Sequence, residues 1–380
     1  MTQRTYGILL LSFSKHSHQR SFVPLYQAHP RIRIVAVADE PEIDPYLKNW
    51  NRSAADELDV PYIESVDDAL SRPDIDIVSI GHEIERRSEL IIRCAGAGKH
   101  VWIDKFLGAT IEECDMVVDQ IGRSGVKTIV PGYTYGELVE TSLALINSGT
   151  LGNLLGVHAD LMFGKGNPRE ITDADRNTPF LPAGQWKFQD IKRELLTIGA
   201  YAVGLVQRCI GPIKHIWGQG DAYFFPEHAA HGADDFGTLS MADTHGRIAT
   251  ISGSRTGVAS HNSGGMNNAF LVGTSGTARV DSNRPSIDTF IRDEIINADY
   301  RVPPDDPMQW ASRAPVQCVG LSTNPLANGL DDLVDAIDKD RPTRYTVEDA
   351  REHMEILLAG YQSIVTGEIV SLPLQRERAQ

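Results

Sequence analysis

Apolar segments of strand length alternate with helical segments over the first third of the 380-residue chain, and this alternation constrains its fold most strongly. The apolar segments are nearly continuous, which is typical of strands buried on both faces of a parallel sheet. Helical segments such as Glu85–Gly96 and Thr110–Gly122 separate them. The pattern predicts an α/β fold with an N-terminal, doubly wound parallel sheet. Its predicted strands occupy residues 4–13, 33–39, 61–63, 76–80, 100–104 and 127–130.

The pattern changes after residue 132, where longer strands with alternating apolar and polar residues follow. One strong helix, Glu194–Ile210, lies among them, and helices at 329–339 and 347–365 follow near the end of the sequence. Such runs of strands predict a C-terminal α+β domain with a large, mostly antiparallel open sheet. We therefore expect two domains, residues 1–132 and 133–380. The strands expected in the second are Leu155–Phe163, His215–Tyr223, Phe236–Ala242, Ile248–Arg255, Phe270–Thr274 and Thr277–Asp281.

The charge balance argues against two classes of partner. The chain has 51 Asp and Glu residues against 36 Lys and Arg residues, a formal net charge of −15. Nucleic acids and anionic membranes attract clustered positive charge, so we expect neither as a partner. No apolar stretch approaches the roughly 18 residues that span a bilayer, and the N-terminal apolar run lacks a signal-peptide cleavage site. Together with four scattered cysteines and no CxxC pair, these features lead us to expect a cytoplasmic protein.

A carboxylate ends the second predicted strand, in the sequence Val35-Ala36-Val37-Ala38-Asp39. Ligands of a parallel sheet bind beyond the carboxyl ends of its strands, where Asp39 would bond both ribose hydroxyls of an adenosine. Glu40 follows and would repel a 2′-phosphate, which favours NAD over NADP. The alternative is that Asp39 only begins a turn.

Several short motifs occur in the order typical of one family of enzymes. With them, the chain resembles the glucose-fructose oxidoreductase and inositol dehydrogenase family, Gfo/Idh/MocA, over nearly its whole length. The motifs are the strand that ends at Asp39, Ala97–Phe106, Ile146–Gly152, Asp234–Phe236, Gly273–Thr277 and the closing segments Val347–Ala350 and Gly367–Pro373.

The resemblance implies a Rossmann-type dinucleotide-binding domain followed by a domain for substrate binding and oligomerisation. It implies an oxidoreductase in which a carbinol hydride passes to the nicotinamide of NAD, with NADP the less favoured dinucleotide. The expected substrate is a small polyhydroxy compound, such as a sugar, a polyol or a related cyclic alcohol. We expect a homodimer or a homotetramer, because a second subunit often covers the open sheet in this family.

The first turn departs from the family pattern. The family has a glycine-rich phosphate cradle here, whereas residues Leu10–His18 contain no glycine. Side chains at these positions would crowd a diphosphate. Ser12, Ser14 and Lys15 are candidates to supply hydroxyl donors and a positive charge instead. The alternative is a turn that binds no dinucleotide.

The resemblance also identifies candidate catalytic residues. The family's Glu-Lys-Pro segment corresponds to Asp104-Lys105-Phe106, which places Asp104 and Lys105 at the cofactor. Its Asp and His, one helical turn apart, correspond to Thr197 and Tyr201. Tyr201 would exchange the hydroxyl proton, and the Lys105 ammonium would lower its pKa and polarise the substrate oxygen. Threonine cannot supply the missing negative charge, and Tyr201 as a packing residue remains the alternative.

Four further residues are candidates for substrate binding. The segment Gln185–Asp190 resembles the family's loop at the substrate mouth, where Trp186 would pack on a sugar face and Lys187 and Asp190 would bond hydroxyls. His158 lies on a strand that runs past the substrate in this family. His158 and Asp160 share one face of that strand, but no third ligand is fixed by spacing, so we expect no metal site.

The two departures leave other functions open. A glycine-free turn and a missing Asp suit a non-redox descendant that acts as a ligand sensor or regulatory partner. A lyase, an epimerase or a glycoside-cleaving enzyme is a third hypothesis, in which a bound nicotinamide cycles within one turnover or a metal replaces it.

Overall fold

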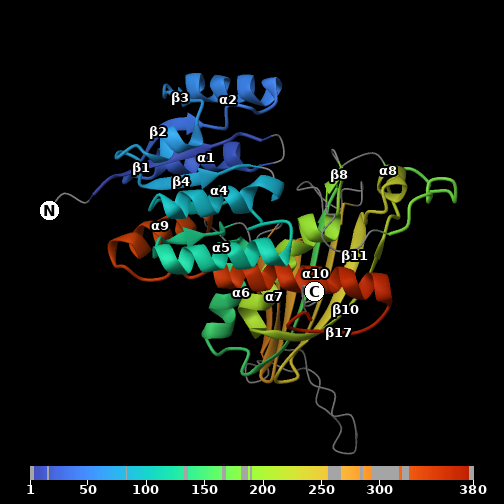
Figure 1. Ribbon diagram of the computed structural model, residues 1–380. Helices are drawn as coiled ribbons and strands as arrows, with labels where there is room; N and C mark the ends of the chain where they lie inside the picture. The colour runs from blue at the N-terminus through green and yellow to red at the C-terminus, as the bar shows by residue number, and fades with distance from the viewer. Residues whose placement is uncertain are drawn as a thin grey trace, which may run out of the picture. The chain divides into compact units, whose positions relative to one another are not determined.

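The computed structural model describes residues 4–14, 17–82, 84–131, 136–164, 168–180, 187–188, 191–255, 267–282, 286–291, 316–318 and 325–375. The chain packs as two compact units (Figure 1). Unit 1 comprises Met1–Tyr135 and Asn324–Met354, and unit 2 comprises Gly136–Thr323 and Glu355–Gln380.

Unit 1 contains the predicted parallel sheet. Its strand order is β3-β2-β1-β4-β5-β6, and every neighbouring pair is parallel. The order reverses between β1 and β4, so the crevice beyond the carboxyl end of β1 is the expected ligand position. The strands are β1 (Tyr6–Leu11), β2 (Ile32–Ala38), β3 (Tyr62–Ile63), β4 (Ile77–Ile80), β5 (His100–Ile103) and β6 (Thr128–Ile129).

Local capping explains where several helices of unit 1 begin. Asp44, Ser65 and Thr110 each accept a backbone N–H of the first turn of α2, α3 or α5, as N-cap side chains do. Gly125, at φ +70°, ends α5. The helices are α1 (Gln19–Ala28), α2 (Pro45–Glu57), α3 (Val66–Leu70), α4 (Ile84–Gly96), α5 (Ile111–Ser124) and α9 (Pro325–Asp338).

The core of unit 1 centres on β1 and on one tryptophan. All six residues of β1 are buried. Trp102 on β5 is fully buried and meets Phe22 and Tyr26 of α1 edge-on, with ring centroids 5.4 and 5.8 Å apart. Removing a buried aromatic ring of this size costs about 3–5 kcal/mol, so these contacts fix α1 on the sheet.

A late segment of the chain returns to unit 1. Helix α9 packs on α1 and β6, and its last residue, Asp338, accepts hydrogen bonds from Tyr6 at 2.5 Å and Arg31 at 2.6 and 2.8 Å. The division expected from the sequence, at residue 132, assigns this segment to the second domain. The amphipathic pattern of a helix shows that one face is buried but not which sheet covers it.

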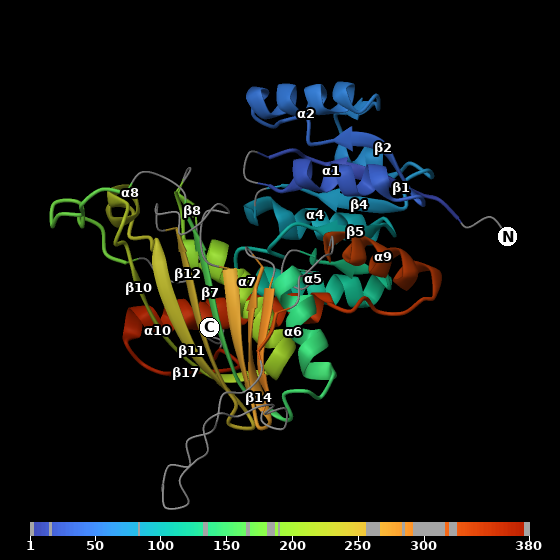
Figure 2. The same cartoon turned by 180° about the vertical axis from the view of Figure 1, so that it is seen from behind.

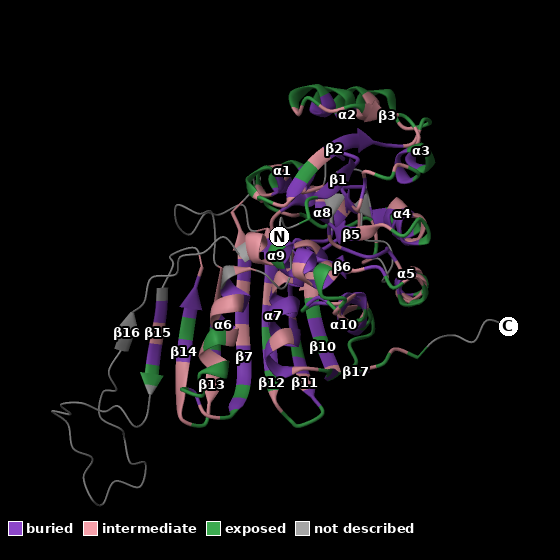
Figure 3. Cartoon of the chain, turned by 90° about the vertical axis from the view of Figure 1, so that its left-hand side faces the viewer, coloured by how far each residue is buried: buried purple, intermediate pink, exposed green. Residues whose placement is uncertain are grey.

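Unit 2 contains the expected large sheet. Nine strands follow the order β16-β15-β14-β13-β7-β12-β11-β10-β17, and only the β7–β12 pair is parallel (Figure 3). A separate hairpin joins β8 (Lys187–Phe188) to β9 (Ile191–Lys192). The nine strands are β7 (Leu154–Phe163), β10 (Ile213–Asp221), β11 (Phe236–Asp243), β12 (Ile248–Arg255), β13 (Asn267–Gly273), β14 (Gly276–Asp281), β15 (Ser286–Ile291), β16 (Val316–Cys318) and β17 (Val370–Ser371).

Helices α6 (Glu137–Asn147) and α7 (Ala200–Ile210) pack against this sheet (Figure 2). A π-helical turn, η2 (Leu195–Gly199), leads into α7. A Cβ on Gly253 of β12 would lie 2.5 Å from the backbone of Gly199, so glycine permits this close approach of strand and helix. The remaining helices are α8 (Pro226–Ala230) and α10 (Val347–Thr366), which begins in unit 1 and ends in unit 2.

The opposite face of the sheet bears exposed apolar side chains. Since Gly253 points toward η2, its neighbours at even positions of β12, such as Thr250, point the other way. Trp217, Ile248, Phe270 and Phe290 are on this face and are 36–53% exposed.

Among the described residues, no helix combines the length and the apolar character needed to cross a membrane.

Candidate functional site

The turn that follows β1 adopts a conformation usually reserved for glycine. Ser12 has φ +65°, and its N–H donates to the carbonyl of Ala38 at 3.0 Å. A Cβ on Gly81, just after β4, would lie 2.5 Å from the Ser12 carbonyl oxygen. The turn therefore follows the tight path of a glycine-rich turn, with serine at the left-handed position.

Among the described residues of this turn, three further backbone N–H groups already have acceptors. Phe13 donates to the Asn51 side chain at 2.7 Å, Ser17 donates to the Ser14 carbonyl at 3.1 Å, and His18 donates to Asp104 at 2.8 Å. The Phe13 side chain is buried. Phosphate cradles work through free backbone N–H groups, so these three are not available in this conformation. Lys15 lies outside the described residues.

Asp104 is at the end of β5, as expected, and its carboxylate holds the start of α1. It is 4% exposed, accepts the His18 backbone N–H, and bonds the His18 ring Nδ1 at 2.9 Å. Burial opposes its ionisation, but the charge and hydrogen bonds of His18 outweigh burial and hold its pKa well below the usual value. Asp104 therefore positions the turn after β1.

Asp39 is also in its expected place, beyond the end of β2, and is fully buried. Its carboxylate accepts hydrogen bonds from His82 Nε2 at 2.8 Å, Asn51 Nδ2 at 2.8 Å and Arg86 at 3.2 Å. Burial opposes ionisation, but the bond to His82 and its charge keep the pKa well below the usual value. An ionised carboxylate is thus present beyond the end of β2, covered by His82 and Arg86.

Glu40 forms an ion pair with Arg93, which also bonds Asp67 at 2.8 Å. The Arg93 guanidinium compensates the negative charge of Glu40, which on sequence grounds would repel a 2′-phosphate. The predicted preference for NAD over NADP therefore relies more on Asp39 than on Glu40.

A cavity of about 350 Å³ lies beside the turn, between the start of α1 and α2. One wall is aromatic, with Trp50 carrying the Arg20 guanidinium 4.8 Å from its ring centre. Arg20 also pairs with Glu57 at 3.1 Å. A ligand with a planar, apolar group next to an anionic group suits this cavity. The planar group would pack on the aromatic wall, and the anion would meet the hydroxyls and the guanidinium. The lining residues are Phe13, Ser14, Ser17, Arg20, Asp44, Tyr46, Leu47 and Trp50.

Lys105 directly follows Asp104 and is half-buried. Its backbone N–H donates to the Asp104 carboxylate at 2.8 Å, and the Lys105–Phe106 peptide bond is cis. The Phe106 side chain is buried, and its carbonyl accepts a hydrogen bond from Arg87 at 3.0 Å. Lys105 is thus anchored through its backbone on both sides.

In unit 2, Thr197 and Tyr201 are both half-buried and lie where η2 passes into α7. The Thr197 hydroxyl donates to the Arg193 carbonyl at 2.8 Å. Short π-helical turns are frequent at functional sites. This one contains Thr197 and is followed directly by α7, which contains Tyr201.

Of the four predicted substrate residues, the structure describes the side chain of His158 alone. His158 bonds Thr250 at 2.7 Å, on the sheet face opposite to Gly253 and η2. Trp186 and Asp190 lie outside the described residues, and for Lys187 the structure gives only its backbone, in β8. The structure therefore does not bring His158 together with Thr197 and Tyr201.

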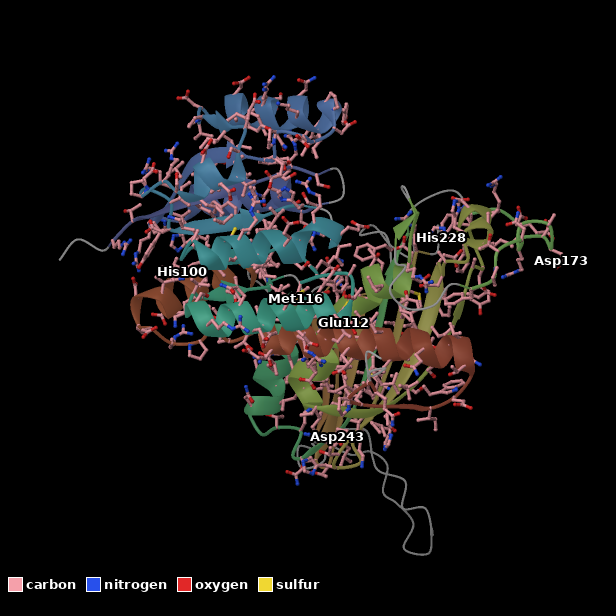
Figure 4. The ribbon with its side chains drawn as sticks, viewed as in Figure 1. His100, Glu112, Met116, Asp173, His228 and Asp243 are labelled. Carbon is pink, nitrogen blue, oxygen red and sulfur yellow. The ribbon has the colours of Figure 1, made fainter. Side chains whose placement is uncertain are left out.

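One buried polar cluster was not singled out from the sequence. Glu194, just before η2, is fully buried and lies 3.0 Å from Arg255 and 3.7 Å from His228 of α8 (Figure 4 labels His228). Two consecutive charged residues, Arg193 and Glu194, before an apolar helix were the available signal. The three members are 34 and 27 residues apart (194 to 228 and 228 to 255), so no spacing rule connects them.

The described residues contain no group of three His, Cys, Asp or Glu side chains that could hold a metal ion. Cys94, Cys114 and Cys209 are buried free thiols, and burial raises the pKa of each to about 12. Buried thiols of this kind are unreactive and structural.

Comparison with known proteins supports the family resemblance. Residues 17–132, within unit 1, match the family described as an oxidoreductase family with an NAD-binding Rossmann fold, GFO_IDH_MocA. This match bears out the resemblance to the Gfo/Idh/MocA family for the N-terminal part of the chain. A curated relative, an uncharacterised oxidoreductase (YrbE) of Bacillus subtilis, is 23% identical over 265 residues, which cover 68% of the chain and 69% of the relative.

Two further likenesses differ in extent. A glycosyl hydrolase family 109 protein of Shewanella is 34% identical over 89 residues, which cover 23% of this chain and 19% of that protein. A solved levoglucosan dehydrogenase, in complex with NADH and levoglucosan, superposes with a TM-score of 0.75 at 17% identity and covers 98% of this chain and 100% of that one. The superposition confirms the fold over the whole chain.

Proposed function

We propose that the protein is an NAD-dependent oxidoreductase that acts on a sugar, a polyol or a related cyclic alcohol by hydride transfer. The observation that carries the proposal is the cavity of about 350 Å³ beside the β1–α1 turn, in a unit that matches a family with an NAD-binding Rossmann fold. Its volume lies within the range of small-molecule sites and suits the adenosine part of a dinucleotide.

Side chains rather than backbone N–H groups would hold the dinucleotide. Ser14, Ser17 and Arg20 line the cavity, and their hydroxyls and guanidinium would donate to phosphate oxygens. For Ser17 this requires its hydroxyl to leave the Ser14 carbonyl, to which it donates at 3.0 Å. Asp39 would accept the ribose hydroxyls once His82 and Arg86 release it. When bound, the nicotinamide supplies the hydride acceptor for alcohol oxidation, and its reduced form supplies the donor for the reverse reaction.

The family resemblance assigns Lys105 and Tyr201 to the reacting hydroxyl. A free tyrosine titrates near about 10, so an ammonium close to it would favour the phenolate and make proton exchange possible near neutral pH. Thr197 would contribute a hydrogen bond. A polyhydroxy substrate agrees with the levoglucosan dehydrogenase among the similar structures.

A second function is favoured by one observation. The N–H groups of Phe13, Ser17 and His18 already donate within the protein, which suits a non-redox ligand sensor or regulatory partner that has lost the phosphate cradle. A lyase, epimerase or glycoside-cleaving enzyme remains the third possibility, and the short match to a glycosyl hydrolase family 109 protein supports keeping it.

We also infer that the protein forms a homodimer or homotetramer in the cytoplasm. The exposed apolar side chains on the open sheet face, including Trp217 and Phe270, form a surface that a second subunit would cover. Light scattering on the purified protein tests this, and a monomer at micromolar concentration contradicts it.

The test of the redox proposal needs no substrate. The purified protein is denatured, and the released small molecules are identified by mass spectrometry. A nicotinamide dinucleotide in the supernatant, or saturable binding of added NAD, supports the proposal. If neither is found, the ligand sensor becomes the better explanation. Binding without turnover of any polyol points to the second or third function.

A further inference from the structure

The buried polar cluster of unit 2 has unused hydrogen-bonding capacity. Glu194 is fully buried, and the His228 side chain is 2% exposed. Within the part of the chain that the structure describes, neither carboxylate oxygen of Glu194 and neither ring nitrogen of His228 makes a hydrogen bond. A buried polar group left without a hydrogen bond costs about 1–3 kcal/mol. The Arg255 guanidinium, at 3.0 Å, offsets this cost for one Glu194 oxygen, so the other three atoms need a compensating partner.

The charges around these atoms limit what that partner can be. The Arg255 guanidinium lies 3.0 Å from Glu194 and balances its negative charge, while His228 Nε2 lies 3.7 Å from the same oxygen. A cation would be repelled by Arg255, and an anion would be repelled by Glu194. A neutral group with hydroxyls satisfies all three side chains, because a hydroxyl both donates to a carboxylate and accepts from a guanidinium or an imidazole.

Two adjacent aspartates hold the cluster in place. Asp234 accepts the Leu195 N–H at 2.6 Å and the Tyr361 hydroxyl at 2.9 Å, and its carbonyl accepts the Glu194 N–H at 3.1 Å. These bonds fix the start of η2, and therefore the position of Glu194.

Asp235 fixes the other two members. Its carboxylate accepts the N–H groups of residues 223, 224 and 225 at 2.8–2.9 Å, just before α8, which carries His228. Its carbonyl accepts the Arg255 N–H at 2.9 Å. Three side chains from distant parts of unit 2 are thus held by one dipeptide, as expected for a preorganised site.

The position of Glu194 on the helix connects the cluster with the predicted reaction. Glu194 precedes Thr197 by three residues and Tyr201 by seven, so the three lie close together along the η2–α7 helix. Thr197 lacks the carboxylate expected at its position by the family resemblance. Glu194 supplies a carboxylate one turn earlier. The Arg255 side chain is 30% exposed, so the cluster borders the surface on that side.

We propose that Glu194, His228 and Arg255 form a subsite for a polyhydroxy ligand, in which neighbouring hydroxyls donate to the Glu194 carboxylate and accept from Arg255 and His228. The class of ligand rests on the proposed function, because a sugar or polyol substrate presents such hydroxyl pairs. The subsite itself requires no dinucleotide.

The test follows the His228 ring by NMR in the full-length protein with isotope-labelled histidine. The signal is assigned by its loss in His228→Gln. D-glucose, D-glucitol and glycerol are titrated with and without NAD, with 1-propanol as the monohydroxy control. We expect a saturable shift with at least one polyhydroxy probe and none with 1-propanol. No shift with any of the three probes contradicts the subsite.

Two variants make the test specific. Glu194→Gln keeps the shape and removes the charge, so it should weaken the response about tenfold. Glu227→Gln, on α8 beside His228 but 42% exposed and paired with Arg169, should leave it unchanged. Should Glu194→Gln fail to fold, Arg255→Lys at the exposed edge gives the same comparison. A response that persists fully in Glu194→Gln or Arg255→Lys overturns the proposal. A His228 response in a protein that binds no dinucleotide refutes the redox function and leaves the subsite standing.

Discussion

Asp104 accepts both the backbone N–H and the ring N–H of His18, at 2.8 and 2.9 Å, with the imidazole Nδ1 as donor. These two hydrogen bonds join the end of β5 to the start of α1. They place a buried carboxylate at a helix N-terminus, the position where a dinucleotide-binding fold usually holds phosphate. The conformation of the turn between β1 and α1 depends on this Asp104–His18 contact.

Replacing Asp104 with Asn should therefore destabilise unit 1. Asn keeps the shape but loses the charge and one of the accepted hydrogen bonds, at a cost of about 2–4 kcal/mol. Urea unfolding monitored by tryptophan fluorescence measures the change. Asp119→Asn, on the exposed surface of α5, is the matched control and should stay within about 0.5 kcal/mol. Equal effects of the two substitutions would show that the Asp104–His18 contact is unimportant.

Acid should destabilise the same unit. The pKa values of Asp39 and Asp104 are both lowered in the folded protein from 3.8, so each contributes stability above that pH. As the pH falls, the two carboxyl groups take up protons in the unfolded chain before they do so in the folded protein. The free energy of unfolding must therefore fall as the pH drops below 3.8. Urea unfolding midpoints measured above and below pH 3.8 show whether acid lowers the stability. The acid-dependent loss should be smaller in Asp39→Asn, and a stability that rises on acidification contradicts the assignment.

Gly253→Ala tests the close approach of β12 and η2. Its new methyl group would lie 2.5 Å from the Gly199 backbone, which cannot move as a side-chain end would. We expect a loss of about 1–3 kcal/mol in thermal unfolding. Gly122→Ala, in α5, meets no atom within 4 Å and should be neutral or stabilising by up to about 1 kcal/mol. If both substitutions changed the stability in the same direction, the close contact between β12 and η2 would be contradicted.

Tyr201→Phe tests the proposed acid–base group. The substitution removes one hydroxyl, so turnover should fall by about 10²-fold or more while dinucleotide affinity stays the same. The control is Tyr223→Phe, because Tyr223 is 53% exposed and lies in another part of unit 2. Steady-state rates and a separate binding titration give the two quantities. Unchanged turnover in Tyr201→Phe would leave Tyr201 a packing residue.

The sequence predicted well what depends on local pattern. The parallel sheet follows from continuous apolar runs, and the positions of Asp39 and Asp104 follow because polar residues end buried strands. It did not predict which groups cover them. His82 is 43 residues from Asp39, and His18 is 86 residues from Asp104, so only the folded chain brings them together. The same holds for Glu194 and His228, which no local pattern relates.

The central claim is that unit 1 binds a dinucleotide through the cavity beside the turn. Trp50 and Arg20 line this cavity, so binding should change tryptophan fluorescence. We predict a saturable change on titration with NAD, tighter than with NADP, that is lost in Trp50→Phe and weakened in Arg20→Ala. No saturable change with either dinucleotide, confirmed by calorimetry, would contradict the account.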